Sequence, residues 1–208
     1  NKAIHDALKG YSEEALREAA AAMEAANAAA KSASEANNAV SNLNNYVDGA
    51  FADGVISEAE ASAIEKYINT VNNAKAAVEA TYNKLYANTY LTGVAKTNLL
   101  NAKVTLMGSI ERLINAINTA IADKLTTSDE KQAVDTQFAS FNSAYADFNT
   151  AVEEANKSIQ DKLKSFADDA MKKALEALQD AADAAKAAEK VNGDVSDLHE
   201  YVDGAFAD

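Results

Sequence analysis

The segment Ala50-Phe-Ala-Asp-Gly-Val-Ile-Ser-Glu-Ala-Glu60 decides the fold, because it ends one helix and starts the next within a few residues. Gly54 lies just past the first helix, where a glycine can supply the left-handed residue that closes many helices. Ser57-x-x-Glu60 is a capping box, in which the hydroxyl accepts from an N–H three residues on and the glutamate accepts from the N–H of the cap. The segment therefore predicts two helices joined by a short turn.

A related segment follows 70 positions later, Ala120-Ile-Ala-Asp-Lys-Leu-Thr-Thr-Ser-Asp-Glu130. It carries a second capping box, Thr127-x-x-Glu130, but Lys124 replaces the glycine and has to close its helix differently. A third short join falls at Asn88–Leu91. Short joins force long helices to be antiparallel neighbours. The sequence predicts an all-α up-down bundle of long antiparallel helices at about 12–50, 57–88, 92–123 and 127–165.

A longer repeat underlies the whole chain. Residues 1–53 recur as residues 156–208, at an offset of 155 and without a gap, and about half of the positions are identical. Tandem repetition is typical of proteins that build length or surface from one unit. We expect residues 1–155 to be one full helical repeat with an internal 70-residue pseudo-repeat, and residues 156–208 to be the first third of the next repeat. The chain is interpreted as a piece of a longer protein.

Apolar residues alternate at spacings of three and four, which predicts coiled-coil-like seams. Lys75 interrupts the seam of 57–88 and is expected to lay its stem along it with its charge in water. The predicted seam residues are Ile64, Ile68, Val71, Val78, Tyr82 and Leu85 in 57–88, and Val134, Phe138, Phe141, Tyr145, Phe148, Val152, Ala155, Ile159 and Phe166 further on.

Two other helices have less regular faces. Asn37 and its copy Asn192 fall on an alanine-rich seam and favour a break or kink, with a register-fixing role as the alternative. Whether residues 127–192 form one helix or bend near Ser165 is open. The expected seams are Leu16, Ala19, Met23, Ala26, Ala30, Ala33, Asn37 and Val40 in 12–50, with Met171, Ala174, Leu178, Ala181, Ala185, Ala188, Asn192 and Val195 in its copy, and two stripes in 92–123, Leu99, Leu106, Ile110, Leu113, Ile117 and Val104, Met107, Ile114, Ile121.

Composition excludes several classes of function. The formal charge of -13 and a pI near 4.6 argue against a nucleic-acid partner, which needs clustered Lys and Arg. The absence of cysteine excludes disulfides and thiolate metal sites. No apolar run approaches membrane-spanning length, so we expect no membrane partner.

The turn from Asp53 to Glu60 resembles the second half of a calcium-binding helix-loop-helix loop. The first and third ligand positions of such a loop fall on Gly49 and Phe51, neither of which has a side-chain oxygen. Helix capping already explains Ser57 and Glu60. We therefore predict no metal site and leave open weak calcium binding at this turn.

No catalytic or cofactor-binding residue is nominated. His5 and His199 are replaced in the other repeat copy by Gln160 and Asn44, so a role needed in every repeat does not rest on them. The carboxylate pairs Glu13-Glu14 and Asp168-Asp169 are typical of a solvated helix surface. We expect the protein not to be an enzyme and to need no cofactor.

The aromatic residues are interpreted mainly as core. Phe138, Phe141 and Phe148 follow the seam, whereas Tyr145 aligns with Lys75 and is unsettled. Tyr82 and Tyr86 lie near a join and are also unsettled. The pair Tyr90-Leu91 is the weak choice for a contact surface at a bundle tip.

Several segments of the repeats are similar in sequence to a known family. The segments Tyr46–Glu60, Thr89–Gly93, Ala95–Leu99 and Ile117–Asp123 resemble the repeated helical regions of tail-associated structural proteins from phages and prophages of gut Bacteroides-type bacteria. The resemblance covers most of the chain and brings no functional residues. It implies a virion component, a tail-fibre or tail-tip segment that spaces or presents a receptor-binding module.

Two hypotheses follow. The leading one is a non-enzymatic helical spacer in a phage tail or fibre protein, whose partners are neighbouring repeats and other virion tail proteins. The alternative is a stalk or ligand-binding module of a bacterial surface adhesin. The bundle is expected to close within one chain, with alanine-rich helices pairing across chains left open, as is a monomer versus a trimer.

Overall fold

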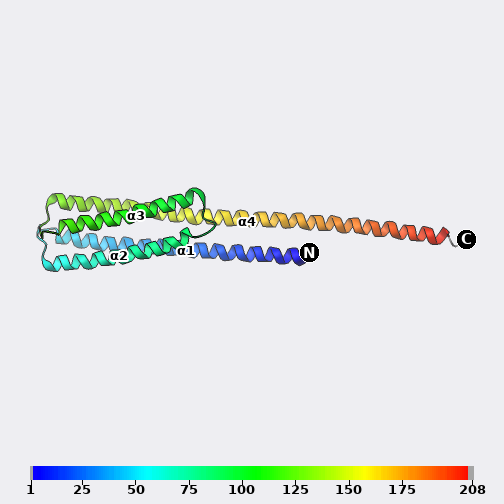
Figure 1. The fold of residues 1–208 in the computed structure, drawn as a ribbon, viewed down its shortest axis with the longest axis horizontal. Coiled ribbons are helices and arrows are strands. Elements are labelled where there is room, and N and C mark those ends of the chain that lie inside the picture. The colour runs from blue at the N-terminus through cyan, green and yellow to red at the C-terminus, as the bar shows by residue number, and fades with distance from the viewer. Residues whose placement is uncertain (1, 206–208) are drawn as a thin grey trace. The chain divides into compact units, whose positions relative to one another are not determined.

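The computed structural model describes the backbone of residues 2–205 and, except at residues 2–5, 8, 12 and 204, their side chains. It contains four long helices packed against each other, α1 (Lys2–Ala50), α2 (Glu58–Tyr86), α3 (Gly93–Ala120) and α4 (Ser128–Ala205) (Figure 1). Over these residues the only β pairing is an isolated antiparallel bridge between Val55 and Leu125. The all-α prediction is confirmed.

Two helices are longer than the sequence predicted. α1 begins at Lys2 rather than near Ser12, and α4 is helical without interruption to Ala205, through Ser165. Ser12 has alanine three residues on, so it lacks the glutamate of a capping box. Gly10 lies inside the helix, where a glycine costs only about 1 kcal/mol relative to alanine. Neither residue is enough to stop the helix.

The break expected at Asn37 and Asn192 is wrong, because α1 and α4 run through these residues. An asparagine in a helix interior costs less than about 1 kcal/mol relative to alanine. The neighbours of Asn37 on the same turns, Ala36 and Val40, are buried. At Asn37 the packing of these neighbours therefore outweighs the propensity of one residue. Around Asn192 the neighbours Val191 and Val195 are exposed, and the small cost of asparagine alone does not end α4.

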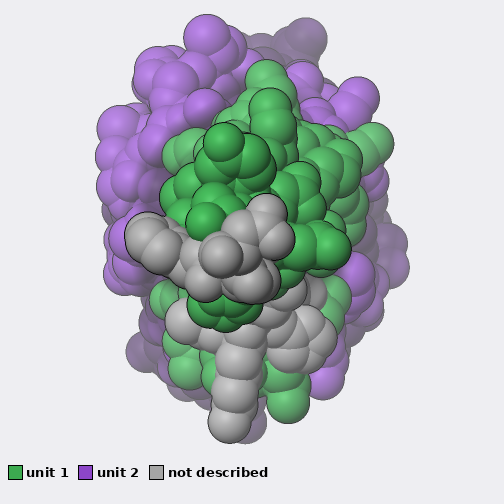
Figure 2. All heavy atoms as spheres, turned by 90° about the vertical axis from the view of Figure 1, so that its right-hand side faces the viewer, with its two compact units in different colours: residues 1–17, 163–208 green, residues 18–162 purple. Residues whose placement is uncertain are grey.

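The chain divides into two compact units (Figure 2). Unit 2 consists of residues 18–162, and unit 1 of residues 1–17 together with residues 163–208.

Unit 2 is an up-down arrangement of four helices. It contains α2, α3, the α1 residues from Glu18 on and the α4 residues up to Lys162. Successive helices are antiparallel, so the chain enters and leaves this unit at the same end (Figure 1). The predicted seams of α2 and α4 are buried at Ile64, Ile68, Val71, Val78, Tyr82 and Leu85, and at Val134, Phe138, Phe141, Phe148, Val152, Ala155 and Ile159.

α1 buries a different stripe from the one predicted. Met23 and Ala30 are exposed, whereas Ala26, Ala33 and Val40 are buried as expected. Every second member of the predicted stripe is replaced by the residue before it, which lies about 100° away around the helix: Ala22, Ala29 and Ala36 are buried where Met23, Ala30 and Asn37 were expected. The structure buries Ala22, Ala26, Ala29, Ala33, Ala36, Val40, Leu43, Val47 and Ala50, at spacings of four and three.

Other seam residues also differ from prediction. Phe166 is exposed, and Leu163 is buried in its place. Tyr145 is half-buried beside the fully buried Ala144. On α3 the first stripe is buried, but Val104 of the second stripe is exposed.

A hydroxyl pair links α1 and α2 inside unit 2. The Ser32 Oγ and Thr81 Oγ1 atoms lie 2.6 Å apart, so one hydroxyl donates to the other, and the accepting hydroxyl donates its own proton to a carbonyl of its own helix. Ser32 is buried and its hydrogen bonds are satisfied, so this polar contact is compatible with the core and favours one register of the two helices.

In unit 1 the two helical segments share a small contact. The rings of Tyr11 and Phe166 meet edge to face, with their centroids 6.1 Å apart. Leu163 and Ala174 are buried. Every described side chain from residue 178 to residue 205 is exposed.

Candidate interaction surfaces

The two turns at one end of unit 2 are joined by their backbones. The Ile56 N–H donates to the Lys124 carbonyl at 2.8 Å, and the Thr126 N–H donates to the Gly54 carbonyl at 3.0 Å. These bonds form the isolated bridge, which leaves Val55 and Leu125 about half-exposed side by side. The similarity of the two turns in sequence does not by itself predict that they pair.

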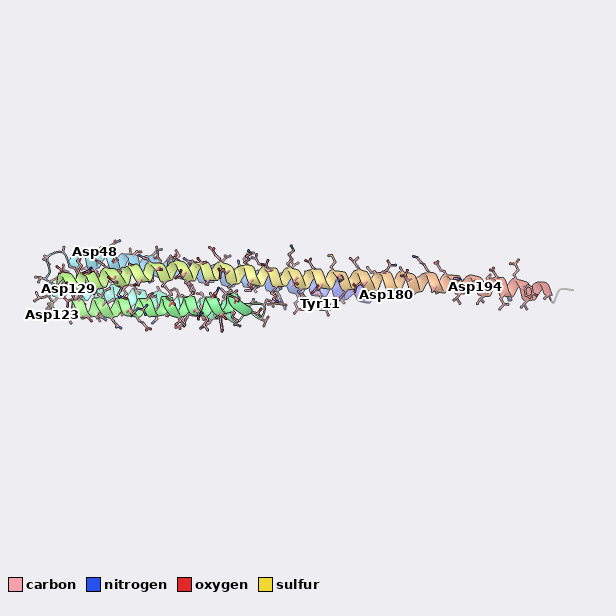
Figure 3. All side chains as sticks on the ribbon, turned by 90° about the horizontal axis from the view of Figure 1, so that it is seen from above. Tyr11, Asp48, Asp123, Asp129, Asp180 and Asp194 are labelled. Atoms are coloured by element: carbon pink, nitrogen blue, oxygen red, sulfur yellow. The ribbon has the colours of Figure 1, made fainter. Side chains whose placement is uncertain are left out.

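Each turn uses its side-chain oxygens in equivalent ways. Asp53 Oδ1 accepts from the Val55 N–H and Asp123 Oδ1 from the Leu125 N–H, both at 3.0 Å. Both capping boxes form as predicted. Glu60 Oε2 accepts from the N–H and hydroxyl of Ser57, and Glu130 Oε2 accepts from the same groups of Thr127. Asp123 and Asp129 lie at this end of the molecule in Figure 3.

These bonds bear on the calcium hypothesis. One oxygen of Asp53 and one of Glu60 are engaged by the chain's own donors. Within residues 2–205 the described side chains form no group of three or more His, Cys, Asp or Glu suited to a metal ion. Weak calcium binding at this turn stays an untested prediction.

A set of four charges crosses from α2 to α3. Lys75 Nζ lies 2.5 Å from Glu111 Oε1, and Lys103 Nζ lies 2.5 Å from Glu79 Oε1. Hydrogen bonding and the positive charge of Lys103 lower the pKa of the Glu79 carboxyl, and Lys75 lowers the pKa of the Glu111 carboxyl in the same way. Both lysine stems are mostly covered while both carboxylates face solvent, as predicted for Lys75.

Tyrosines flank this charge set. Tyr82 is buried and stacks on Tyr86, with their centroids 5.3 Å apart, and burial raises the pKa of the Tyr82 hydroxyl. The Lys96 ammonium lies 4.4 Å from the centroid of the Tyr86 ring. Tyr82 is therefore core, and Tyr86 is half-buried beneath a cation.

The contact surface predicted at Tyr90-Leu91 is wrong for Leu91, which is fully buried. Tyr90 is half-buried, and its N–H donates to the Asn88 side chain at 2.9 Å. The leucine fixes the join between α2 and α3 by filling the core. Of the two residues, only Tyr90 is partly exposed and could take part in a contact.

One of the two histidine side chains, His199, lies within the described residues, and it neighbours a carboxylate of its own helix. His199 is exposed, and its Nε2 lies 3.4 Å from Asp203 Oδ2 one turn further on the same helix. The side chain of His5 lies outside the described residues. Glu13, Glu14, Asp168 and Asp169 are exposed on helix surfaces.

Large apolar side chains are exposed at matching places in the two repeat copies. Leu16 corresponds to Met171 and Met23 to Leu178, and all four are exposed although the sequence analysis placed them in seams. The size of the side chain is similar at each pair of positions. These two pairs of exposed apolar residues are therefore candidates for a contact surface that occurs in every repeat.

Unit 1 contains an open groove of about 370 Å³. Its walls are largely apolar, with Lys173 and Asp169 among them, and Tyr11 comes from α1 (Figure 3). Beyond this groove α4 continues with an exposed apolar stripe at Val191, Val195, Leu198 and Val202.

No helix within residues 2–205 is both long and apolar enough to cross a membrane. Comparison with known proteins gives no relative: no family model matches the chain, and no curated protein and no solved structure is similar to it.

Proposed function

We propose that this chain is a non-enzymatic structural repeat of a phage tail or fibre protein, a helical spacer that positions a receptor-binding module. The observation that carries the proposal is the continuity of α4. It runs from Ser128 to Ala205 and so passes the boundary of the 155-residue period, between residues 155 and 156, without a break. The helix that ends one repeat also begins the next, as in repetitive arrays.

The second support is the internal regularity of the unit. Burial at alternating spacings of three and four along α1, α2 and α4 favours coiled-coil-like packing. The 70-residue pseudo-repeat is supported by the equivalent hydrogen bonds of the two turns. A unit made of interchangeable helices and turns suits a protein whose task is to build length or surface.

The polar groups of the described residues also favour a structural role. The carboxylates of the turns cap helices, and the partly covered lysines pair with glutamates across α2 and α3. The aromatic residues Phe141 and Phe148 are fully buried. These groups serve the fold itself, which leaves no evident nucleophile and base to assign.

The assignment to a virion rests on the resemblance of the repeat segments to those of phage tail-associated proteins. Immunoelectron microscopy tests this assignment. Antibodies raised against this chain are expected to label the tails of purified phage particles from the producing strain. Labelling confined to the envelope of cells that carry no particles would refute the assignment.

A second candidate function is a ligand-binding module of a bacterial surface adhesin. The exposed pairs Leu16/Met171 and Met23/Leu178 favour it, because similar apolar side chains stand uncovered in both repeat copies. In this case antibodies label the envelope. Washed cells lose binding to host surfaces when Met171 and Leu178 are both replaced by glutamate, while Gln179→Glu on the same helix leaves it unchanged.

A further inference from the structure

The long helices change direction once in every repeat. The chain reverses three times between α1 and α4, at the joins that precede α2, α3 and α4 (Figure 1). In an up-down arrangement three reversals leave the fourth helix antiparallel to the first. Since α4 runs unbroken past residue 155 and so also begins the next repeat, successive long helices have opposite directions. With an even number of reversals the direction would be kept and the repeats would advance along one axis.

Unit 1 contains a contact between equivalent positions of the two repeat copies. Tyr11 and Phe166 are 155 positions apart, so they occupy the same position in their repeats. Their rings nevertheless meet edge to face, with their centroids 6.1 Å apart. Helices that carry the same repeat in opposite directions bring identical positions together where they cross. A repeat that advanced along its axis would instead separate these positions by a full period.

The surroundings of this crossing are also equivalent in the two copies. Ala15 and its copy Ala170 are both half-buried, and Tyr11 and Phe166 are 52% and 41% exposed. Small residues from both helices, among them Ala7 and Ala170, line the groove beside the rings. Matching burial at matching positions is what a local two-fold axis between two copies produces. The crossing is therefore a contact of the repeat with itself.

The copy of α1 retains the residues that a further bundle needs. Eleven residues of α1 between Ala22 and Ala50 are buried in unit 2. Eight of the eleven are identical 155 positions later, against seven of the other 18 positions in this range. The three that differ are Ser32, Ala36 and Ala39, which become Ala187, Val191 and Asp194. Helices equivalent to α2, α3 and the start of α4 would therefore find nearly the same packing face in the copy.

We propose that successive repeats fold back on one another, so that the long helices lie side by side in alternating directions. The proposal rests on the structural-repeat function proposed above. Each long helix packs with its first part in one bundle and with its second part in the next, as residues 128–162 and 173–205 of α4 do. The number of repeats then sets the width of the array, and one long helix sets its length. A helix of 78 residues is about 117 Å long.

A linear array, in which every repeat advances along the same axis, is the alternative. It needs a fourth reversal in each period, and the only place for it is a break in the long helix between two bundles. α4 is helical without interruption from Ser128 to Ala205. Nothing in the repeat therefore supplies the reversal that a linear array requires.

Small-angle X-ray scattering of lengthened chains tests the fold-back. The octapeptide Tyr46–Asp53 recurs as Tyr201–Asp208, so residues 54–208 can be added after Asp208 in register, once or twice. The mass rises with each addition. The maximum dimension is expected to stay within about 20 Å of that of the parent chain, because each added helix lies about 10 Å to the side. A maximum dimension that grows in proportion to the number of repeats would overturn the proposal.

Paired variants test whether the added helices cover the copy of α1. Val195 and Val202 are the counterparts of Val40 and Val47, which are each 1% exposed in unit 2. Val195→Glu/Val202→Glu is expected to lower the urea midpoint of the lengthened chain and to leave that of the parent unchanged, as followed by circular dichroism. Ser196→Glu, at the counterpart of the exposed Ser41, is expected to change neither.

An unchanged midpoint of the lengthened chain after the valine substitutions would contradict the proposal, because the copy of α1 would then not be covered. Both experiments use purified chains, and their outcome does not depend on whether antibodies label virions. Failure of the fold-back and failure of the virion assignment are therefore distinguishable.

Discussion

Lys124 occupies a turn position that has glycine, Gly54, in the matching turn. It adopts a φ of +65°, close to the +75° of Gly54 in the matching turn. A left-handed conformation costs a residue with a Cβ about 1–2 kcal/mol. Lys124 therefore closes α3 by taking the glycine conformation itself, and its carbonyl still accepts the hydrogen bond from Ile56.

Lys124→Gly is expected to raise the free energy of unfolding by up to about 1 kcal/mol, because relief of the left-handed strain exceeds the entropic cost of glycine. The lost pair between Lys124 and Glu58 is exposed and contributes little. Urea denaturation followed by circular dichroism measures the change. The reverse change, Gly54→Ala, is expected to destabilise by about 1 kcal/mol, since its Cβ would lie 3.3 Å from the Thr126 carbonyl oxygen. If Lys124→Gly destabilises instead, the left-handed strain is not the dominant effect.

The stripe on α1 gives a second prediction for single residues. Leu43→Ala is expected to destabilise by about 2–5 kcal/mol, because Leu43 is fully buried and its truncation leaves a cavity. Met23→Ala, on the stripe that the sequence favoured, is expected to change stability by no more than about 0.5 kcal/mol. Thermal denaturation of the two variants compares them directly. A larger loss for Met23→Ala would restore the stripe predicted from sequence.

At the scale of helices, the number and order of the elements could be predicted from sequence, because the patterns that mark helix ends and buried faces are local. Capping boxes at Ser57 and Thr127 and large apolar residues on α2 and α4 mark ends and faces without ambiguity. On α1 nearly every candidate is alanine, so the apolar pattern has little contrast between neighbouring stripes. The two largest side chains, Leu16 and Met23, then point to the wrong face. Which stripe is buried depends on the three helices that cover it, and this is not encoded locally.

The contact between the two turns could not be predicted from the sequence either. The bonds of Ile56 and Thr126 join residues 68 and 72 positions from their acceptors, Lys124 and Gly54. Alignment of the two turns hinted at equivalence but not at proximity.

The α2–α3 pair carries a pH prediction. The pKa of Glu79 and Glu111 is lowered from 4.5 in the folded state, so their ion pairs stabilise the fold above about pH 4.5 and this contribution is lost as the pH falls through the lowered values. The double variant Lys75→Met/Lys103→Met is therefore expected to be less stable than the parent at pH 7, with a difference that narrows toward pH 3. Urea denaturation at both values measures it. Lys66→Met, at an exposed position of α2, serves as the control, and a difference independent of pH would show that packing of the lysine stems dominates.

At the scale of the whole molecule, one helix spans regions of very different stability. In α4 the residues up to Ile159 contribute to the core of unit 2, while those from 178 to 205 have no buried side chain. A helix without packing is marginally stable in water. Amide hydrogens of residues 181–205 are therefore expected to exchange orders of magnitude faster than those of residues 134–159. Exchange measured by mass spectrometry checks this, and uniform protection along α4 would contradict it.

The even number of helices in unit 2 has a mechanical consequence. Because α1 enters and α4 leaves at the same end, a pull applied to the chain on both sides of the unit loads those two helices as a zipper (Figure 1). Contacts such as those of Ala22 and Ile159 would open one after another, each bearing the full force in turn, instead of sharing it along the length of the helices. A unit with an odd number of helices would be loaded in shear. Under such a pull unit 2 would therefore be expected to open at lower tension than a bundle loaded in shear, and to close again when the tension is released.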